Sequence, residues 1–476
     1  MTGWDAKRIA EAAGATLLAE PSSARASAPS SVGIDSRALS PGELFIGLRG
    51  AREDGGTHAQ SALEAGAWGV LVSPAHARAA ARAPAGSAVL EHPDPLAGLQ
   101  ALARARRREL AGAGAKVVAI TGSTGKTSTK DILAALLGSR MRTSASPANL
   151  NTEIGLPLAI LAAPADSEAL VLEMAMRGAG QIAELTAIAE PDVGVIVNVG
   201  PAHLEMLGSL EAIAAAKAEL IAGLAPGTSI VVPADEPLLD RHLRPDLRTI
   251  TFGHGGDVSL LSRRADGRAL IRHRTKKIEL WPSFQQEHNI VNLLAAVATA
   301  RALGVTPEGR LEVRFSAMRG ERLALPGGVV LIDDCYNANP MSMRAAIDDL
   351  AETAPARRVA VLGDMLELGP DAPRMHREIG EHAAARGVEL LVTVGPLAGE
   401  IARTFSGEAH AVADAAAAAE LLAGLLRKRD TVLVKGSRGV GLERTVAALR
   451  AGGERPLREH GGGGSLLAPG TGTGRR

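Results

Sequence analysis

Aromatic side chains are scarce in this sequence. Its 476 residues include five Phe, three Trp and one Tyr, about 2% of the chain, although 46% of the residues are hydrophobic. The buried cores must therefore be built mainly from Ala, Val, Leu and Ile. Cysteine is almost absent as well, and the single one excludes an internal disulfide and fits a reducing compartment.

Net charge is also lacking, because 52 Lys and Arg balance 52 Asp and Glu. This balance argues against a nucleic-acid-binding protein that relies on a broad basic surface. No apolar run approaches the roughly 20 residues that a membrane span needs, and residues 1–20 are charged too often for a signal peptide. We expect a soluble, cytoplasmic protein with no transmembrane segment.

The length favours about three domains, and the pattern of apolar runs and polar turns along the chain divides it into three segments. We expect an α/β fold with a small mixed α/β domain over 1–112 and a central P-loop ATPase-like domain with a parallel sheet over 113–320. A Rossmann-like α/β domain is expected over 321–452. In the last two segments, short apolar runs end in polar or Gly-rich turns, which is typical of parallel strands buried on both faces. The Gly-rich tail 453–476 has little to bury, so we expect it to be disordered.

The stretch VVAITGSTGKTSTKDILAALL, residues 117–137, indicates a phosphate-binding loop between a strand and a helix. Its glycines let backbone N–H groups approach phosphate oxygens at a helix N-terminus. Lys126 would reach the outer phosphates, and the Thr127 hydroxyl would bind Mg²⁺. The standard P-loop pattern is incomplete because Ile120 occupies its first Gly position, and the alternative is a Gly-rich turn with an incidental Lys. The predicted nucleotide-binding residues are Gly122, Ser123, Thr124, Gly125, Lys126, Thr127 and Ser128.

Further candidates lie where the neighbouring strands end, which is where open α/β sheets bind ligands. Glu173 ends the apolar run ALVLE, and a second metal ligand beside Thr127 explains an acid at that position. His203 follows VGVIVNVG, and Lys217 lies in a helix of small residues. Taken singly, His203 could be a packed structural histidine and Lys217 a solvated helix residue, but their combination with Glu173 favours a catalytic site.

Eight ordered stretches then resemble a known family. They are TGSTGKTS, SPANLNTEIGLPLAIL, LEMAMRGAGQIAEL, NVGPAHLEMLGSLEAIAAAKAEL, HNIVNLLAA, DDCYNANPMSM, LGDMLELG and LVKGSR. Together they resemble the Mur ligases, which build the peptide stem of the bacterial cell-wall precursor. The resemblance covers residues 30–450.

Within the family, YNANP (336–340) and KGSR (435–438) resemble the members that join D-alanyl-D-alanine to UDP-N-acetylmuramoyl-tripeptide. The member that adds the third residue typically has DNPR and KGHE motifs, which this chain lacks. The alternatives are a Mur ligase that adds a single amino acid and a P-loop ATPase or regulatory protein that transfers no acyl group. The sequence leaves open whether the tripeptide ends in lysine or diaminopimelate, and we expect a monomer.

The resemblance implies acyl activation, in which ATP phosphorylates the terminal carboxylate of the tripeptide and the dipeptide amine attacks the acyl phosphate. It implies catalytic roles for Lys126, Glu173, His203 and Lys217. Thr127 and Glu173 would hold one Mg²⁺, and His203 would help to place a second. Lys217 matches a family lysine that can be carbamylated and would then orient the second metal.

The resemblance also implies nucleotide contacts from Asn289, Arg322 and Asp334. The implied substrate-binding residues are Ser36 and Arg37 near the uridine diphosphate, Asn149, Asn151 and Thr152 near the muramoyl-peptide, and Tyr336, Asn337, Asn339, Asp364, Lys435 and Ser437 for the dipeptide. Structural alternatives exist for several of them: Asn289 could cap a helix, Asp334 could form a turn, and the Lys and Arg residues could form ion pairs. Cys335 is adjacent, but the mechanism needs no nucleophile, so we interpret it as a packed side chain.

Overall fold

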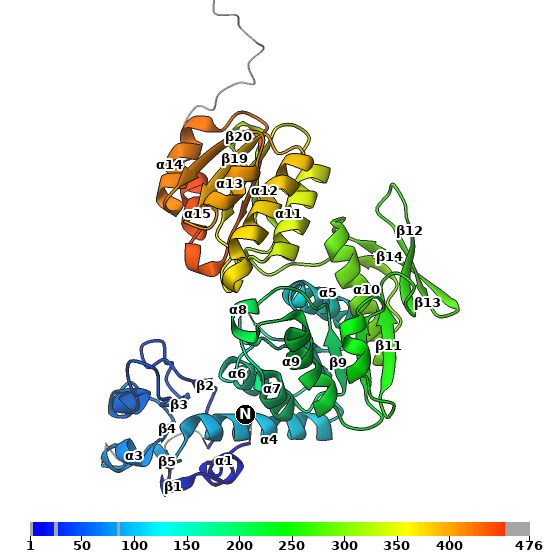
Figure 1. Cartoon of the computed structure of the whole chain (residues 1–476). Helices are drawn as coiled ribbons and strands as arrows, with labels where there is room; N and C mark the ends of the chain where they lie inside the picture. The colour runs from blue at the N-terminus through cyan, green and yellow to red at the C-terminus, as the bar shows by residue number, and fades with distance from the viewer. Residues whose placement is uncertain (1–2, 23–26, 83–85, 148, 453–476) are drawn as a thin grey trace, which may run out of the picture. The chain divides into compact units, whose positions relative to one another are not determined.

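The computed structural model describes residues 3–22, 27–82, 86–147 and 149–452 of the chain (Figure 1). The chain divides into two compact units, Met1–Ser316 and Ala317–Arg476. Among the described residues, the first unit contains two sheets and the second contains one, and helices cover all three. The predicted fold class, α/β with three sheet domains, is confirmed. The tail 453–476 lies outside the described residues.

The first sheet has the strand order β1-β5-β4-β3-β2 and is parallel except for β1. Its strands are β1 (Thr16–Ala19), β2 (Val32–Gly33), β3 (Leu44–Ile46), β4 (Gly69–Val72) and β5 (Ala88–Glu91). The accompanying helices are α1 (Ala6–Ala13), η1 (Gly55–His58), α2 (Ala59–Glu64), α3 (Pro74–Ala80) and α4 (Pro95–Gly112). The Asp94 carboxylate caps α4 by accepting from the N–H groups of Leu96 and Ala97.

The central sheet has the order β15-β14-β13-β12-β11-β10-β9-β6-β8-β7. It was expected to be parallel, but it is mixed, because β13 pairs antiparallel with both β12 and β14. Its strands are β6 (Lys116–Thr121), β7 (Thr143–Ala145), β8 (Ala169–Glu173), β9 (Val193–Ile196), β10 (Ser229–Pro233), β11 (Arg248–Phe252), β12 (Val258–Arg263), β13 (Ala269–His273), β14 (Lys276–Pro282) and β15 (Gly309–Leu311). Its helices are α5 (Lys126–Gly138), α6 (Gly155–Ala162), α7 (Gln181–Ala189), α8 (Leu204–Leu207), α9 (Leu210–Gly223), η2 (Pro237–His242) and α10 (Glu287–Ala302).

Strand β6 lies between β8 and β9, and both pair with it in parallel. Ile120 is in register with Glu173, and Thr121 is in register with Ile196. The three strands therefore end side by side. From β6 the chain continues to β7 and β8 on one side and then crosses to β9 on the other, so the order of the strands reverses at β6. Such a switch point is where open α/β sheets bind ligands.

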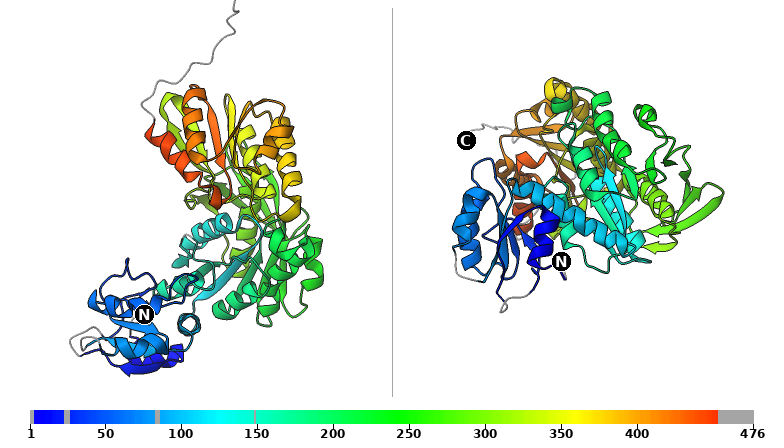
Figure 2. Two further views of the ribbon diagram at one scale, coloured as in Figure 1. Left: turned by 60° about the vertical axis from the view of Figure 1, so that its left-hand side comes forward. Right: turned by 90° about the horizontal axis from the view of Figure 1, so that it is seen from below.

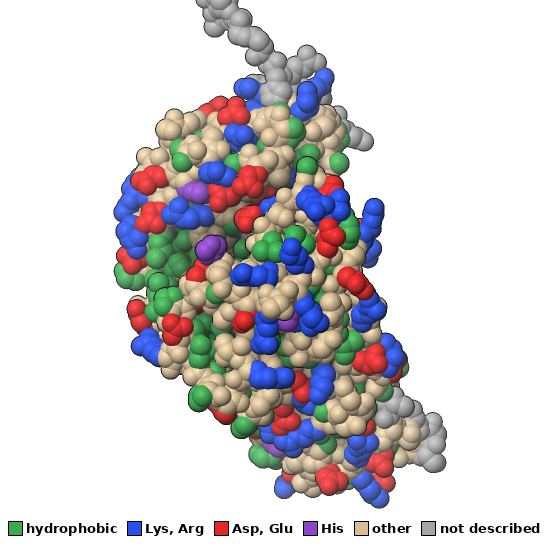
Figure 3. Space-filling model, turned by 90° about the vertical axis from the view of Figure 1, so that its right-hand side faces the viewer, with side chains coloured by type: hydrophobic (Ala, Val, Ile, Leu, Met, Phe, Trp, Pro, Cys, Tyr) green, Lys and Arg blue, Asp and Glu red, His purple; other side chains and the backbone are tan. Residues whose placement is uncertain are grey.

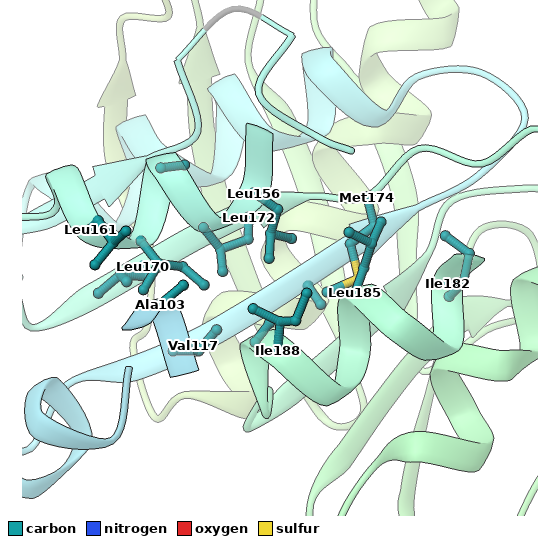
Figure 4. Packing of buried hydrophobic residues seen from close by; sticks show 14 of the residues in the cluster. Ala103, Val117, Leu156, Leu161, Leu170, Leu172, Met174, Ile182, Leu185 and Ile188 are labelled. Carbon is teal, nitrogen blue, oxygen red and sulfur yellow. The ribbon is translucent and has the colours of Figure 1, made fainter. Parts of the chain in front are cut away.

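Alternate residues of β6 face two different cores, as a strand covered on both faces requires. Val118 and Ile120 belong to the cluster that includes α5 and α10, whereas Val117 belongs to the cluster that includes α4, α6, α7 and α9. Figure 4 shows part of the second cluster, where aliphatic side chains and Met174 fill the interior. The expected aliphatic core is thus present in the central sheet.

The sheet of the second unit has the order β16-β17-β21-β18-β19-β20 and is parallel except for β16. Its strands are β16 (Glu321–Leu325), β17 (Val329–Asp333), β18 (Arg358–Gly363), β19 (Leu390–Val394), β20 (Glu408–Val412) and β21 (Thr431–Lys435). Figure 2 shows this sheet between its helices, which are η3 (Pro326–Gly328), α11 (Pro340–Thr353), η4 (Gly369–Asp371), α12 (Ala372–Ala385), α13 (Gly399–Thr404), α14 (Ala415–Leu425), η5 (Arg438–Val440) and α15 (Glu443–Ala451).

The surface mixes charges of both signs. On the face shown in Figure 3, Lys and Arg side chains alternate with Asp and Glu, without one large field of either sign. This distribution agrees with the equal numbers of acidic and basic residues in the sequence. None of the described helices combines the length and the apolar character of a membrane-spanning segment.

Truncating a core residue of the central sheet should destabilise the first unit. Leu170 on β8 is 1% exposed and lies in the cluster of Figure 4. We expect Leu170→Ala to lower the free energy of unfolding by about 2–5 kcal/mol, because the removed atoms leave a cavity. Urea unfolding followed by circular dichroism measures the shift. The matched control is Leu261→Ala, since Leu261 is 44% exposed; an equal shift in both variants would contradict the expectation.

Candidate active site

The loop between β6 and α5 has the backbone of a phosphate cradle. Gly125 precedes the helix with φ 78°, and no side chain caps the first N–H groups of α5. A Cβ at this position would lie 2.5 Å from Oδ1 of Asn292, so only glycine fits. The uncapped N–H groups and the positive end of the helix dipole favour an anion there. Ser128 lies in the first turn of this helix.

Asn198, which follows β9, holds the tip of the phosphate loop. Its Oδ1 accepts from the N–H groups of Ser123 and Thr124 at 3.1 and 3.0 Å, and its Nδ2 donates to the Thr124 carbonyl at 3.2 Å. The Ser123 hydroxyl donates to the Gly200 carbonyl at 2.8 Å and accepts from the Gly200 N–H at 2.9 Å. The phosphate loop and the loop after β9 are therefore one hydrogen-bonded unit.

The acid at the end of β8 meets the first turn of α5. Glu173 is 2% exposed, and its Oε2 accepts from the Thr127 hydroxyl at 2.8 Å. Its other oxygen accepts from Nδ2 of Asn151 at 2.9 Å. A buried carboxylate is costly unless a cation or several donors compensate it, and both of these donors are neutral.

The two predicted lysines lie close enough to repel each other. Nζ of Lys126 donates to the Gly122 carbonyl at 2.8 Å, so the ammonium lies over the phosphate loop. Lys217 on α9 is 1% exposed. Burial lowers the pKa of Lys217 well below its usual value, and the charge of Lys126 lowers it further. The Lys217 amine is therefore neutral over a wider pH range than an exposed lysine.

The loop that carries His203 contacts the carboxylate of Glu236. His203 precedes α8 with φ 60°, a left-handed conformation that is uncommon for a residue with a Cβ. Four residues earlier, the Val199 N–H donates to Oε2 of Glu236 at 3.3 Å. Burial raises the pKa of the Glu236 carboxyl. The strained histidine thus belongs to the same loop as the Asn198 contacts.

The remaining predicted residues of the first unit have different surroundings. Asn151 contacts Glu173, as described, and the Thr152 hydroxyl accepts from the Gly155 N–H at 3.3 Å at the start of α6. Asn149 is exposed in the same loop. Arg37 forms an ion pair of 2.8 Å with Asp35 on the surface, next to the half-buried Ser36. The hydrogen bonds from Arg37 lower the pKa of Asp35 to about 2.

In the second unit, two predicted residues of different roles pair with each other. Nζ of Lys435, at the end of β21, lies 2.6 Å from Oδ2 of Asp334, which follows β17. The Lys435 ammonium also donates to the Asn337 carbonyl at 3.0 Å. Its side chain is 3% exposed, so this ammonium is neutralised within the unit.

Asp364 and Ser437 organise the loops around the end of β18. The Asp364 carboxylate accepts from the Ala398 N–H at 2.6 Å, and burial raises its pKa. The Ser437 hydroxyl accepts from the Leu366 N–H at 2.9 Å. Asn339 caps α11 through a capping box with Ser342. These three side chains are thus engaged with nearby backbone.

Arg322 lies on β16, and its guanidinium contacts α11. Its Nη2 lies 2.9 Å from both carboxylate oxygens of Asp349 and 2.8 Å from the Thr353 hydroxyl. The Asp349 side chain is 7% exposed and the Arg322 side chain 31% exposed, so only the carboxylate end of the pair is buried. Arg322 therefore forms an ion pair within the fold, which was the structural alternative given from the sequence for the Lys and Arg residues.

The donors around the phosphate loop suit Mg²⁺. Thr127 offers a hydroxyl and Glu173 a buried carboxylate, and Mg²⁺ prefers oxygen ligands and is commonly held by few protein groups together with substrate phosphates. Among the described residues there is no group of three or more His, Cys, Asp and Glu that could hold a metal alone. The arrangement therefore fits a metal shared with a phosphate rather than a closed protein site.

Two site residues were missed by the sequence reasoning. Asn198 ends a buried run just as Glu173 does, so the same rule about strand ends could have indicated it. Asn292 lies three residues after Asn289 on α10, and its Nδ2 donates to Oδ1 of Asn289 at 3.2 Å. Residues at that spacing share one helix face. An amide carries no charge and no motif, which is why neither stood out.

Three family descriptions together match most of the chain. "Mur ligase family, catalytic domain" covers 29–107, "Mur ligase middle domain" covers 120–300, and "Mur ligase, glutamate ligase domain" covers 309–438. The chain belongs to the Mur ligase family. The resemblance seen in the sequence is confirmed.

Similar curated proteins share one name. The chain is 36% identical over 433 residues to a UDP-N-acetylmuramoyl-tripeptide–D-alanyl-D-alanine ligase of Bacillus subtilis, covering 88% of this chain and 92% of that protein. It is 38% identical over 468 residues to the ligase of the same name from Mycobacterium bovis, with the same coverage.

Solved structures agree with these relatives. MurF from Acinetobacter baumannii matches with a TM-score of 0.83 at 27% identity, covering 94% of this chain and 99% of that one. MurF ligase from Thermotoga maritima, solved in complex with ADP, matches with a TM-score of 0.75 at 30% identity, covering 89% and 98%. The full three-domain architecture of this Mur ligase is therefore shared with both.

Cys335 of this Mur ligase should be inert. Its side chain is buried, and Sγ lies 2.9 Å from Oδ1 of Asp333. Burial and the neighbouring carboxylate raise the pKa of the thiol, which suppresses the reactive thiolate. We expect a disulfide reagent to modify the native chain far more slowly than the chain in guanidinium chloride, and Cys335→Ala to retain full ligase activity. Rapid modification with parallel loss of activity would contradict this.

Proposed function

We propose that this chain is the ATP-dependent ligase that joins D-alanyl-D-alanine to UDP-N-acetylmuramoyl-tripeptide, giving the pentapeptide, ADP and phosphate. One observation carries the proposal: a phosphate loop with the Thr127–Glu173 pair at 2.8 Å occurs in a chain that matches ligases of this name over about nine-tenths of both lengths. A regulatory nucleotide-binding protein would have no need for the two flanking domains that match as well.

The phosphate loop is suited to position the nucleotide for attack by an anion. The N–H groups at the start of α5 would hold the phosphates, and the Lys126 ammonium would offset the repulsion between the γ-phosphate and the attacking carboxylate. Mg²⁺ bound by Thr127 and Glu173, with a second ion near His203, would withdraw negative charge from the phosphates. Asn198 keeps the loop in shape, so the phosphates meet a preformed site.

In the proposed reaction, a carboxylate oxygen of the tripeptide attacks the γ-phosphorus and ADP leaves. The neutral amine of the dipeptide then attacks the acyl carbon, and phosphate leaves as the amide forms. Both steps bring reactants together in a fixed geometry, which is the main contribution that binding residues make to such a reaction. Residues at the strand ends of the second unit, Tyr336 and Asn337 among them, would present the dipeptide.

Loss of the Lys126 ammonium should slow the reaction at the phosphate. We expect Lys126→Ala to reduce kcat by about 10²–10³-fold, the effect of removing one preorganised charge-stabilising group. Phosphate release is measured with ATP, the nucleotide tripeptide and D-alanyl-D-alanine. The control is Lys116→Ala, because Lys116 begins β6 at its other end and its side chain is 53% exposed. The proposal fails if wild-type phosphate release needs no acceptor, or if single amino acids replace the dipeptide.

We also propose that Lys217 is carbamylated. A neutral amine adds CO₂ to form an N-carboxylate and release a proton, and burial favours the neutral form of this amine by lowering its pKa. The product would be an anion near the Lys126 charge and the predicted metal ligands, in place of a buried neutral amine.

Carbamylation has a direct spectroscopic test. With ¹³C-bicarbonate, we expect a carbamate carbon signal in the wild-type protein and none in Lys217→Arg, because a guanidinium does not form the adduct. Lys130→Arg is the matched control, since Lys130 is also a buried lysine of the first unit. Identical spectra for wild type and Lys217→Arg, or a bare amine in the density of crystals grown with bicarbonate, would exclude the modification.

A further inference from the structure

Two arginines converge on the chain's single tyrosine. Tyr336 follows β17, and the guanidinium carbon of Arg319 lies 4.0 Å from its ring centroid. The guanidinium carbon of Arg438 lies 5.8 Å from the same centroid. Both distances are within the range of cation–π attraction. Arg438 is the last residue of the KGSR motif, but no role was assigned to either arginine from the sequence.

The backbone conformation around Arg319 positions its side chain next to Tyr336. Met318 has φ 59°, a left-handed conformation that is unfavourable for a residue with a Cβ. Its carbonyl accepts from the Tyr336 N–H at 3.4 Å, and its Sδ lies 3.4 Å from Nη1 of Arg438. On the other side of Arg319, the Gly320 N–H donates to the Asp333 carbonyl at 2.9 Å. The turn thus places one arginine over the ring and contacts the other.

The charges of this cluster are not balanced by neighbouring acids. Lys435 is paired with Asp334, and Arg322 is paired with Asp349. In contrast, neither Arg319 nor Arg438 has a carboxylate within 4.0 Å among the residues that the structure describes. The positive charges of both guanidinium groups on this ring are therefore available to an anion.

We propose that Arg319 and Arg438, which both contact the ring of Tyr336, bind the terminal carboxylate of the incoming peptide. The assignment rests on the proposed function. The acceptor must offer a neutral amine to the acyl phosphate. Its ionised group is then the carboxylate at the opposite end of the dipeptide. A guanidinium binds a carboxylate through two parallel hydrogen bonds, and the ring of Tyr336 offers an apolar surface to the methyl groups of alanine.

The test compares two acceptors that differ only in this charge. D-alanyl-D-alanine and D-alanyl-D-alaninamide are assayed at saturating ATP and nucleotide tripeptide. We expect the wild type to prefer the acid, and Arg438→Ala and Arg319→Ala to lower kcat/KM for the acid by about 10–100-fold, as the loss of a charged hydrogen bond predicts. The value for the amide should hardly change, so the preference for the acid should collapse. KM for ATP should be unchanged.

Matched variants separate binding from folding. Arg438→Lys and Arg319→Lys keep the positive charge but lose the paired N–H donors of the guanidinium. They should retain part of the preference for the acid over the amide. Arg450→Ala removes an exposed arginine of α15 and should leave the preference intact.

The assignment is overturned if the acid-to-amide preference persists in both alanine variants, or if their defect appears in KM for ATP, which would place a nucleotide phosphate there instead. It also fails if the wild type does not distinguish the acid from the amide. A wild type that accepts neither dipeptide refutes the proposed function itself, which is a separate result.

Discussion

The buried carboxylate of Glu173 is the group on which the candidate active site depends. It ends β8 in register with Ile120 of β6, so the sheet itself fixes its distance to the phosphate loop. Only 2% of the residue is exposed, and its two oxygens meet the Thr127 hydroxyl and the Asn151 amide. A charge buried against neutral donors is stabilised much more by a bound cation.

The charged groups fall into two classes, and the distinction separates structure from function. Some are neutralised inside the fold, as Lys435 is by Asp334 and Arg322 by Asp349. Others, such as Arg319 and Arg438, are held in place by an aromatic ring and a strained turn without an acid. Like charges repel each other, so the anionic ligand that we propose would stabilise this arrangement.

Much of the site was readable from the sequence because its residues follow strands. The phosphate loop and Glu173 lie at the ends of apolar runs, and parallel strands gather such ends at one edge. Asn198 and Asn292 obey the same geometry but were missed, because an uncharged amide at a strand end or within a helix resembles any other polar residue. Arg319 was overlooked because nothing in the sequence shows that the backbone turns at Met318.

The sequence by itself determined the α/β class, the aliphatic cores, the phosphate loop and the family, because periodicity and motifs are properties of neighbouring residues. Only the tertiary structure decided which charges pair and which stay available. Lys435 and Asp334 are 101 residues apart in the chain yet form an ion pair of 2.6 Å, and Arg438 reaches Met318 across 120 residues. Electrostatic energy depends on distance through space. That distance depends on the order in which strands pack, which local sequence patterns do not reveal.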